Sequence, residues 1–136
     1  MGNQGKVRYD MGVMLSVCPT FQVHQPARIK RFRVFDIGND NDYFNDASDS
    51  DLNNRRVTEL VADRSYRPAA HILENLLKRN STFRFGLSLS GVGAEQLEQY
   101  APDVLESFRR MVDTKRVEVL ASPYYHSLAF FYLFSP

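Results

Sequence analysis

Short apolar segments alternate with segments of helical periodicity along this chain, and the alternation limits the folds open to it. Residues 13–23, 83–90 and 117–122 are short, rich in strand-forming residues and bounded by Gly, Pro or Asn, so they predict strands. Residues 67–80 and 93–114 carry helical patterns. Because helices separate the strands, we expect parallel pairing through right-handed crossovers, which is an α/β fold.

Each helical pattern has one apolar face that is predicted to pack inward. Apolar residues recur three and four positions apart in both segments, and Pro102 is expected to open a second helical piece in the later one. The inward positions are Ala69, Ile72, Leu73, Leu76 and Leu77 in the first segment, and Leu97, Ala101, Val104, Leu105, Phe108 and Val112 in the second.

A basic stretch, residues 28–33, precedes an acidic and Asn-rich segment, residues 36–54. The basic residues alternate with apolar ones, which is typical of an amphipathic edge strand, or of a segment that binds phosphate or RNA. We favour a solvated edge strand, because the acidic segment beside it leaves no extended positive patch. The acidic segment is predicted to be a long loop that is either functional or a solvated insertion.

Composition narrows the partners. The chain has 136 residues, 43% of them hydrophobic, and 17 basic side chains against 16 acidic ones, so one small domain is expected and net charge predicts no nucleic acid. It has neither a signal peptide nor an apolar run near the ~20 residues of a membrane span, so no membrane is expected. The single cysteine, Cys18, is predicted to be buried in a cytoplasmic protein.

Residues 128–134 raise the question of what covers them. They include five large apolar side chains, whose burial is worth about 10 kcal/mol in total. Either they fill a core, or the chain is the front piece of a longer protein whose further strands cover them. We favour truncation, because a three-stranded parallel sheet leaves two open edges.

Two histidines, His24 and His126, follow predicted strands. Ligands of α/β folds bind at the carboxyl ends of parallel strands, so both histidines are candidates for one site, with structural hydrogen bonding as the alternative. Gln25 adds donors and acceptors that suit sugar hydroxyls. Tyr124 and Tyr125 offer flat apolar surfaces for a sugar, or else cap the core.

Metal and phosphate signatures are missing. The sequence has no HExxH, HxxxH or CxxC pair, and an EF-hand register beginning at Asp49 fails because Asn54 replaces the glycine. The glycines of residues 91–95 lack the lysine of a phosphate loop and indicate a turn into a helix. His71 is interpreted as structural. We therefore expect neither a metal nor another cofactor.

Three quoted segments carry a family resemblance. They are FQVHQPARIKRFRVFDIGND, GLSLSGVGAEQLEQYAPDVLESF and VEVLASPYYHSLA, and their most specific parts are His-Gln-Pro, Asp-Ile-Gly-Asn-Asp and Tyr-Tyr-His-Ser-Leu. From about Met14 onward the chain resembles the amino-terminal portion of glycoside hydrolase family 57, in its α-amylase-like branch. Residues 1–12 match nothing and are expected to be an extension, whereas residues 13–136 are expected to be a partial barrel domain.

The resemblance implies the first part of a seven-stranded (β/α)7 barrel that acts on α-glucans such as starch or glycogen with retention of configuration. It implies substrate-binding roles for His24 and His126, with Gln25 and Tyr125 as companions. The family's glutamate nucleophile and aspartate acid/base lie on later strands, so no catalytic residue is assigned here. Glu118 is interpreted as a structural residue or as one that supports a site residue. Because a retaining mechanism needs both carboxyl groups, the chain alone is expected to be inactive.

Other functions stay open beside this hypothesis. One is a non-catalytic carbohydrate-binding domain, or an inactive remnant, that keeps half of the cleft. A 4-α-glucanotransferase is less favoured, and a metal-dependent deacetylase on a related barrel is disfavoured because its Asp-Asp and His-x-x-x-His signals are absent. Pro19 and Pro123 depart from the expected pattern, since proline removes a donor from a strand.

Overall fold

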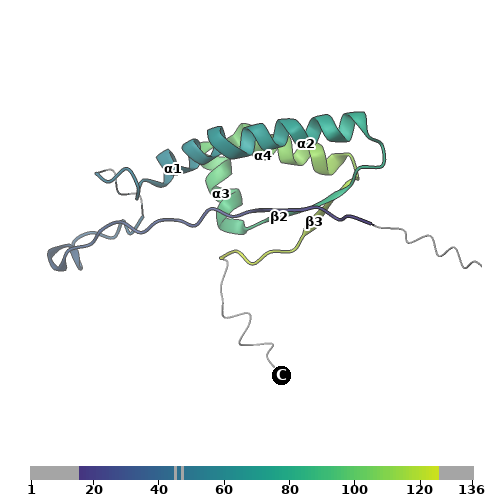
Figure 1. Cartoon of the computed structure of the whole chain (residues 1–136). Coiled ribbons are helices and arrows are strands. Elements are labelled where there is room, and N and C mark those ends of the chain that lie inside the picture. The colour runs from purple at the N-terminus through teal and green to yellow at the C-terminus, as the bar shows by residue number, and fades with distance from the viewer. Residues whose placement is uncertain (1–15, 45, 47, 126–136) are drawn as a thin grey trace, which may run out of the picture.

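The computed structural model describes residues 16–44, 46 and 48–125, and it contains three parallel strands in one sheet. The strands lie side by side in the order β1-β2-β3 (Figure 1). Their bounds are β1 Thr20–Val23, β2 Phe85–Leu89 and β3 Val117–Leu120. The predicted α/β fold with parallel pairing is confirmed. The sheet is open, so the predicted barrel is not seen in the described residues and stays a prediction.

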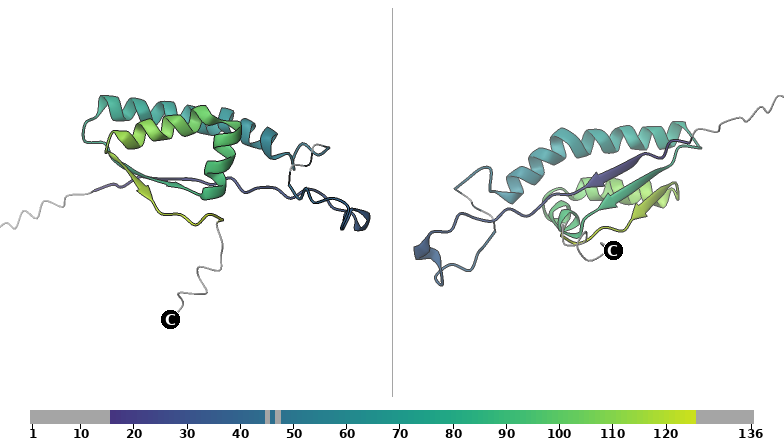
Figure 2. Two further views of the ribbon diagram at one scale, coloured as in Figure 1. Left: turned by 180° about the vertical axis from the view of Figure 1, so that it is seen from behind. Right: turned by 60° about the horizontal axis from the view of Figure 1, so that its bottom comes forward.

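The helices lie on one side of this sheet (Figure 2). They are α1 Asn54–Val61, a π-helical turn η2 Ala62–Tyr66, α2 Arg67–Arg79, α3 Gly91–Tyr100 and α4 Pro102–Asp113, with a short 3-10 helix η1 Val34–Asp36 in the loop after β1. Of these, α2 and α4 lie side by side above the sheet, and α3 rises from the sheet toward them. Right-handed crossovers between strands that advance in one direction put every helix on the same side. No described helix is long and apolar enough to cross a bilayer.

Local signals explain where these helices begin and end. The side chains of Asn53 and Ser90 accept hydrogen bonds from backbone N–H groups of the first turns of α1 and α3. Pro102 begins α4 as predicted, because a proline in the first turn loses no intrahelical hydrogen bond. At the other end of the layer, Arg116 donates to the carbonyl of Leu77 at 2.7 Å and so satisfies the end of α2.

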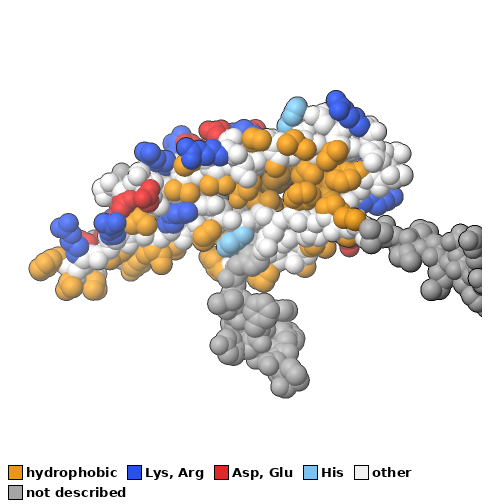
Figure 3. All heavy atoms as spheres, viewed as in Figure 1, with side chains coloured by type: hydrophobic (Ala, Val, Ile, Leu, Met, Phe, Trp, Pro, Cys, Tyr) orange, Lys and Arg blue, Asp and Glu red, His pale blue; other side chains and the backbone are white. Residues whose placement is uncertain are grey.

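The core lies between the helices and the sheet. Figure 3 shows further hydrophobic side chains on the surface, between the helices and the near edge of the sheet. Its buried members are Val23, Ala62, Ala70, Leu73, Leu77, Phe85, Leu87, Leu97, Ala101, Val104, Phe108, Met111 and Val117. The inward face predicted for α2 was partly wrong, because Ile72 and Leu76 are 58% and 41% exposed. In the described residues α4 is the neighbouring helix that packs along α2, so the apolar face of α2 is wider than its cover.

Two further predictions need correction at the start of the sheet. β1 begins at Thr20, so residues 16–19 of the predicted first strand are not part of it. Pro19 has no N–H to donate, although its carbonyl accepts a bond of 2.9 Å from Gly86 N. Cys18 precedes the strand and is exposed rather than buried.

The predicted loop 36–54 ends at residue 53, and the helical stretch from Asn54 to Tyr66 was not predicted.

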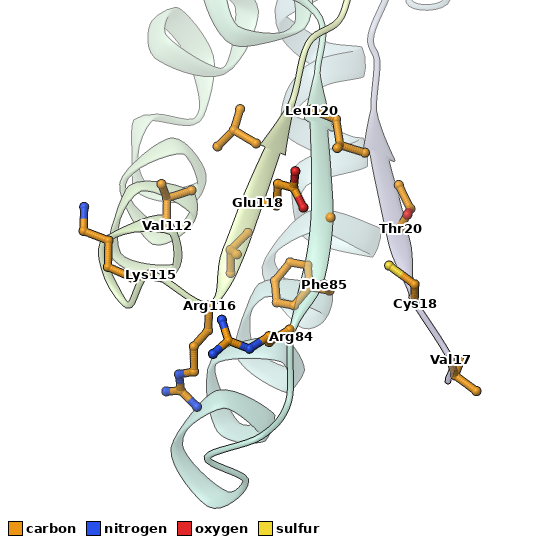
Figure 4. Close-up of a pocket in the computed structure, with 13 residues that line it drawn as sticks. Val17, Cys18, Thr20, Arg84, Phe85, Val112, Lys115, Arg116, Glu118 and Leu120 are labelled. Carbon is orange, nitrogen blue, oxygen red and sulfur yellow. The ribbon is translucent and has the colours of Figure 1, made fainter. Parts of the chain in front are cut away.

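Among the described residues, no element covers the face of the sheet away from the helices, and this face is largely polar. Thr20, Gly86 and Glu118 lie opposite one another across the three strands. A hollow of about 640 Å³ opens beside them, toward the amino-terminal ends of the strands, with Arg84 and Arg116 at its rim (Figure 4). Ligands of α/β sheets bind at the opposite, carboxyl ends of the strands, so the candidate site is expected there.

Candidate functional site

The chain leaves β1 at its carboxyl end and enters a long loop, residues 24–53, which we call the β1–α1 loop. Its base is fixed by Asn54, which is 4% exposed. The amide oxygen of Asn54 accepts from Arg28 N at 2.6 Å, and its amide nitrogen donates to the Arg28 carbonyl at 3.1 Å. The loop then returns on itself, with an antiparallel bridge between Ile29 and Phe44. Phe44 is thereby brought next to the end of β1.

The basic and acidic stretches of this loop pair with each other. Lys30 bonds Asp40 at 2.5 Å and Arg31 bonds Asp49 at 2.9 Å. The hydrogen bond and charge of each partner raise the pKa of Lys30 and lower the pKa of Asp40. The expected edge strand is wrong, because the described part of the stretch forms only the bridge at Ile29.

His24 is the first residue after β1, and a serine on the next crossover fixes its ring. Nδ1 of His24 lies 2.8 Å from Oγ of Ser90, which also accepts from Gly93 N at 3.2 Å. Ser90 is fully buried, and its own N–H donates to the Val23 carbonyl at 3.1 Å. The amino-terminal cap of α3 therefore doubles as the support that orients the imidazole at the sheet edge.

Gln25 points into the protein instead of standing beside His24. It is 6% exposed, and its carbonyl accepts from Gln96 Nε2 at 2.6 Å. The Gln96 amide oxygen accepts in turn from the hydroxyl of Thr58 at 3.0 Å, so α1 and α3 are joined to the turn after β1. Among the described residues, the side-chain Nε2 of Gln25 has no hydrogen-bond partner. A buried donor without an acceptor is costly and marks a place where a partner is needed.

Two tyrosines follow β3 and approach the same edge. The ring of Tyr124 lies over Gly91, where a Cβ would come within 2.1 Å of the ring. Its hydroxyl donates to the Glu95 carboxylate, which raises the pKa of Tyr124 to about 12. The ring of Tyr125 stands edge-on to that of Tyr124, with centroids 4.7 Å apart. Glycine at position 91 thus lets the tyrosine pair sit close to the start of α3.

Two adjoining cavities lie between these elements, and we call them the histidine cavity and the glutamine cavity. The histidine cavity, about 260 Å³, is lined by His24, Pro26, Ala27, Ile29, Phe44, Val92 and Tyr125. The glutamine cavity, about 240 Å³, is lined by Ala27, Phe44, Asn54, Val92, Glu95, Gln96, Gln99, Tyr100 and Tyr125. Phe44 and Tyr125 belong to both, so the two hollows form one continuous surface.

The predicted site residues fall into three groups. His24 and Tyr125 meet in the histidine cavity. Gln25 is buried and does not line it, so its predicted sugar contact is untested, and His126 lies outside the described residues. Ser90 and Phe44 were missed. A serine directly before a helical pattern is a capping signal that indicates Ser90, whereas nothing in the acidic loop singles out Phe44.

In the part of the chain that the structure describes, no group of three or more His, Cys, Asp or Glu side chains is placed to hold a metal ion. What the sheet edge offers instead is an imidazole, amide and carboxylate groups, and aromatic faces. Together with the parallel sheet, they define an α/β domain whose polar and aromatic groups gather at the carboxyl ends of its strands.

Comparison with known proteins gives the family. The model of glycosyl hydrolase family 57 matches residues 20–132, and the chain belongs to this family. It is similar to a protein of Methanocaldococcus jannaschii named "Putative alpha-amylase", with 33% identity over 109 residues. The match covers 79% of this chain and 22% of that protein, so the chain spans about a fifth of the relative's length. No solved structure matches it.

Proposed function

We propose that this chain binds α-glucans at the carboxyl edge of its sheet, as the first part of a family 57 (β/α)7 barrel. The observation that carries the proposal is the histidine cavity, in which His24 is oriented by Ser90 and faces the same space as Tyr125 and Phe44. An imidazole can exchange hydrogen bonds with hydroxyls, while aromatic faces suit the C–H surface of a sugar ring. Membership of glycosyl hydrolase family 57 supports a carbohydrate ligand, and the similarity to a protein named "Putative alpha-amylase" supports an α-glucan.

The barrel part of the proposal is supported by topology. The strands follow each other in space in chain order, and the helices lie on one face (Figure 1). Continuing this winding would curl the sheet around its uncovered face, which bears Thr20, Ser88 and Glu118. Glu118 is exposed there and would point into a barrel interior.

We further propose that the described residues contribute sugar contacts but not the cutting chemistry. A retaining glycosidase needs two carboxyl groups about 5 Å apart, one on each side of the bond. Among the described residues that line the two cavities, Glu95 is the only carboxylate, and it accepts the hydroxyl of Tyr124. The chain is therefore expected to bind an α-glucan without releasing reducing ends.

The test is an NMR titration of the full chain with maltotetraose, with the β-linked cellotetraose as a comparison. We expect saturable binding of maltotetraose that His24→Ala abolishes. His71→Ala is the matched control, because His71 is an exposed histidine of α2 whose ring lies 3.3 Å from the amide nitrogen of Asn75. A folded wild-type protein that does not bind maltotetraose, or a His24→Ala variant that binds as well as wild type, would contradict the proposal.

A parallel assay for reducing ends addresses the alternatives. Release of reducing ends by the purified chain would show that a complete acid and nucleophile pair is present, contrary to the proposal. Binding without cleavage supports the sugar-binding role and separates it from a hydrolase or glucanotransferase activity of this chain alone.

A further inference from the structure

We propose that the glutamine cavity is a second glucose-binding position, so that this edge takes at least two α-linked glucose units, one on each side of a wall formed by Phe44 and Tyr125. The inference rests on the proposed function and deepens it, because it gives the site a minimum substrate length. The bound glucan would run from His24 along the outer side of α3 toward Gln99.

The first argument is continuity. The two cavities share Ala27, Phe44, Val92 and Tyr125, so a ligand can pass from one to the other without leaving the surface. Each is smaller than the ~300 Å³ at which ligand pockets usually begin. A ligand that uses this edge with useful affinity therefore has to extend across both.

The second argument is chemical. The histidine cavity is mainly apolar apart from the imidazole, whereas the glutamine cavity adds amide and carboxylate groups. Asn54 and Gln96 are already engaged in holding the loop and α1, but Gln99 is exposed and its side chain makes no hydrogen bond to another described residue. Its amide offers both a donor and an acceptor, the pairing that adjacent hydroxyls of one sugar require.

The third argument is that the wall is built before a ligand arrives. Phe44 is 48% exposed but is anchored by its bridge to Ile29. Tyr125 is 66% exposed and stands against Tyr124, whose hydroxyl is held by Glu95. Exposed aromatic rings held on a fixed backbone lose little freedom on binding, which favours affinity for flat ligands.

The experiment compares ligands of one, two and four glucose units, namely methyl α-glucoside, maltose and maltotetraose, by NMR titration of the full chain. We expect maltose to bind about tenfold more tightly than methyl α-glucoside. We also expect maltose, and not methyl α-glucoside, to shift the side-chain amide signal of Gln99. Phe44→Ala and Gln99→Ala should each remove most of the gain in affinity with length, and Phe44→Tyr should keep it.

Phe35→Ala is the matched control, since Phe35 is a phenylalanine of the same loop, 86% exposed and absent from the lining of both cavities. Because Gln99 is a surface residue, Gln99→Ala remains informative if Phe44→Ala fails to fold. Equal affinity for methyl α-glucoside and maltose, or a length gain that survives Gln99→Ala, would overturn the second position and leave the proposed function standing. If none of the three ligands binds, both proposals fail together.

Discussion

Removing the hydroxyl of Ser90 should cost more than the loss of a helix cap. The Oγ of Ser90 accepts from Gly93 N at 3.2 Å and lies 2.8 Å from Nδ1 of His24, and the residue is fully buried. Loss of an N-cap side chain costs about 1 kcal/mol. Leaving a second, partly buried group without its partner adds about 1–2 kcal/mol. The Ser90→Ala variant is therefore expected to lose about 2–3 kcal/mol of unfolding free energy.

The chain contains its own control for the capping part of this loss. Asn53 caps α1, because its side-chain Oδ1 accepts a hydrogen bond from Arg56 N at 2.9 Å. No hydrogen bond from a second described side chain to this oxygen is seen, in contrast to Oγ of Ser90. Asn53→Ala should therefore cost about 1 kcal/mol. The extra loss in Ser90→Ala measures what the serine gives to His24.

The assay is urea unfolding followed by circular dichroism, with maltotetraose binding measured on the same samples. For an m value of about 1.5 kcal/mol per M, the unfolding midpoint should fall by about 1–2 M in Ser90→Ala and by less than about 1 M in Asn53→Ala. Sugar affinity should drop in Ser90→Ala only. Equal midpoints in the two variants, or unchanged sugar affinity in Ser90→Ala, would refute the idea that Ser90 orients the imidazole.

The remaining predictions concern charge, close packing and the loop. The Asp103 carboxylate accepts a hydrogen bond from Arg67, which lowers the pKa of this carboxyl. The stabilisation, at most about 1 kcal/mol for an exposed pair, is therefore present above pH ~4 and is lost as pH falls through the lowered pKa. In urea unfolding, an Asp103→Asn variant should lose less stability than wild type between pH 5 and 2. In Gly91→Ala the new methyl group displaces the Tyr124 ring, so a spectrophotometric titration should show the pKa of Tyr124 falling from about 12 toward its usual 10, and no change would contradict the packing. Asn54→Asp replaces an amide donor with a second acceptor, so hydrogen exchange of the loop amides beside it should accelerate while exchange in the sheet stays slow.

Local patterns predicted the sheet well but placed the first strand poorly. Phe85–Leu89 and Val117–Leu120 fall inside the predicted segments, because both are short apolar segments with turn signals on each side. The apolar run before Pro19 looked like part of β1, yet strand pairing requires donors and partners on the neighbouring strand. The exposure of Cys18 follows from the same error.

The missed helical stretch Asn54–Tyr66 shows a limit of composition. Asn53, which caps it, sits in a segment full of Asn and Asp, where a capping residue cannot be told from a loop residue. The helix is recognisable only from spaced apolar positions such as Val57 and Val61 among charged neighbours. Tertiary packing makes it helical, since its buried face contacts α3.

The residues of the candidate site also differ in how far local sequence patterns could predict them. Strand ends predicted His24, because the rule that ligands bind at carboxyl ends needs only the position of a strand. Its partner Ser90 lies 66 residues further along the chain, and no spacing rule connects the two. Phe44 reaches the cavity only because the loop folds back, which depends on Asn54 and on the bridge to Ile29.

The ion pairs between the basic and acidic residues of the β1–α1 loop add little to the stability of the protein. Lys30 and Arg31 make exposed or half-exposed ion pairs, and such pairs stabilise a fold only slightly because solvent screens the charges. The loop is fixed instead by two buried polar residues, Asn54 at 4% and Asp46 at 5% exposure, and hydrogen bonds from Ser48 lower the pKa of the Asp46 carboxyl. Buried polar groups that are fully hydrogen-bonded specify one arrangement of the chain. Because that arrangement carries Phe44 to the two cavities that Tyr125 also lines, the loop is placed to form a wall of the proposed sugar site.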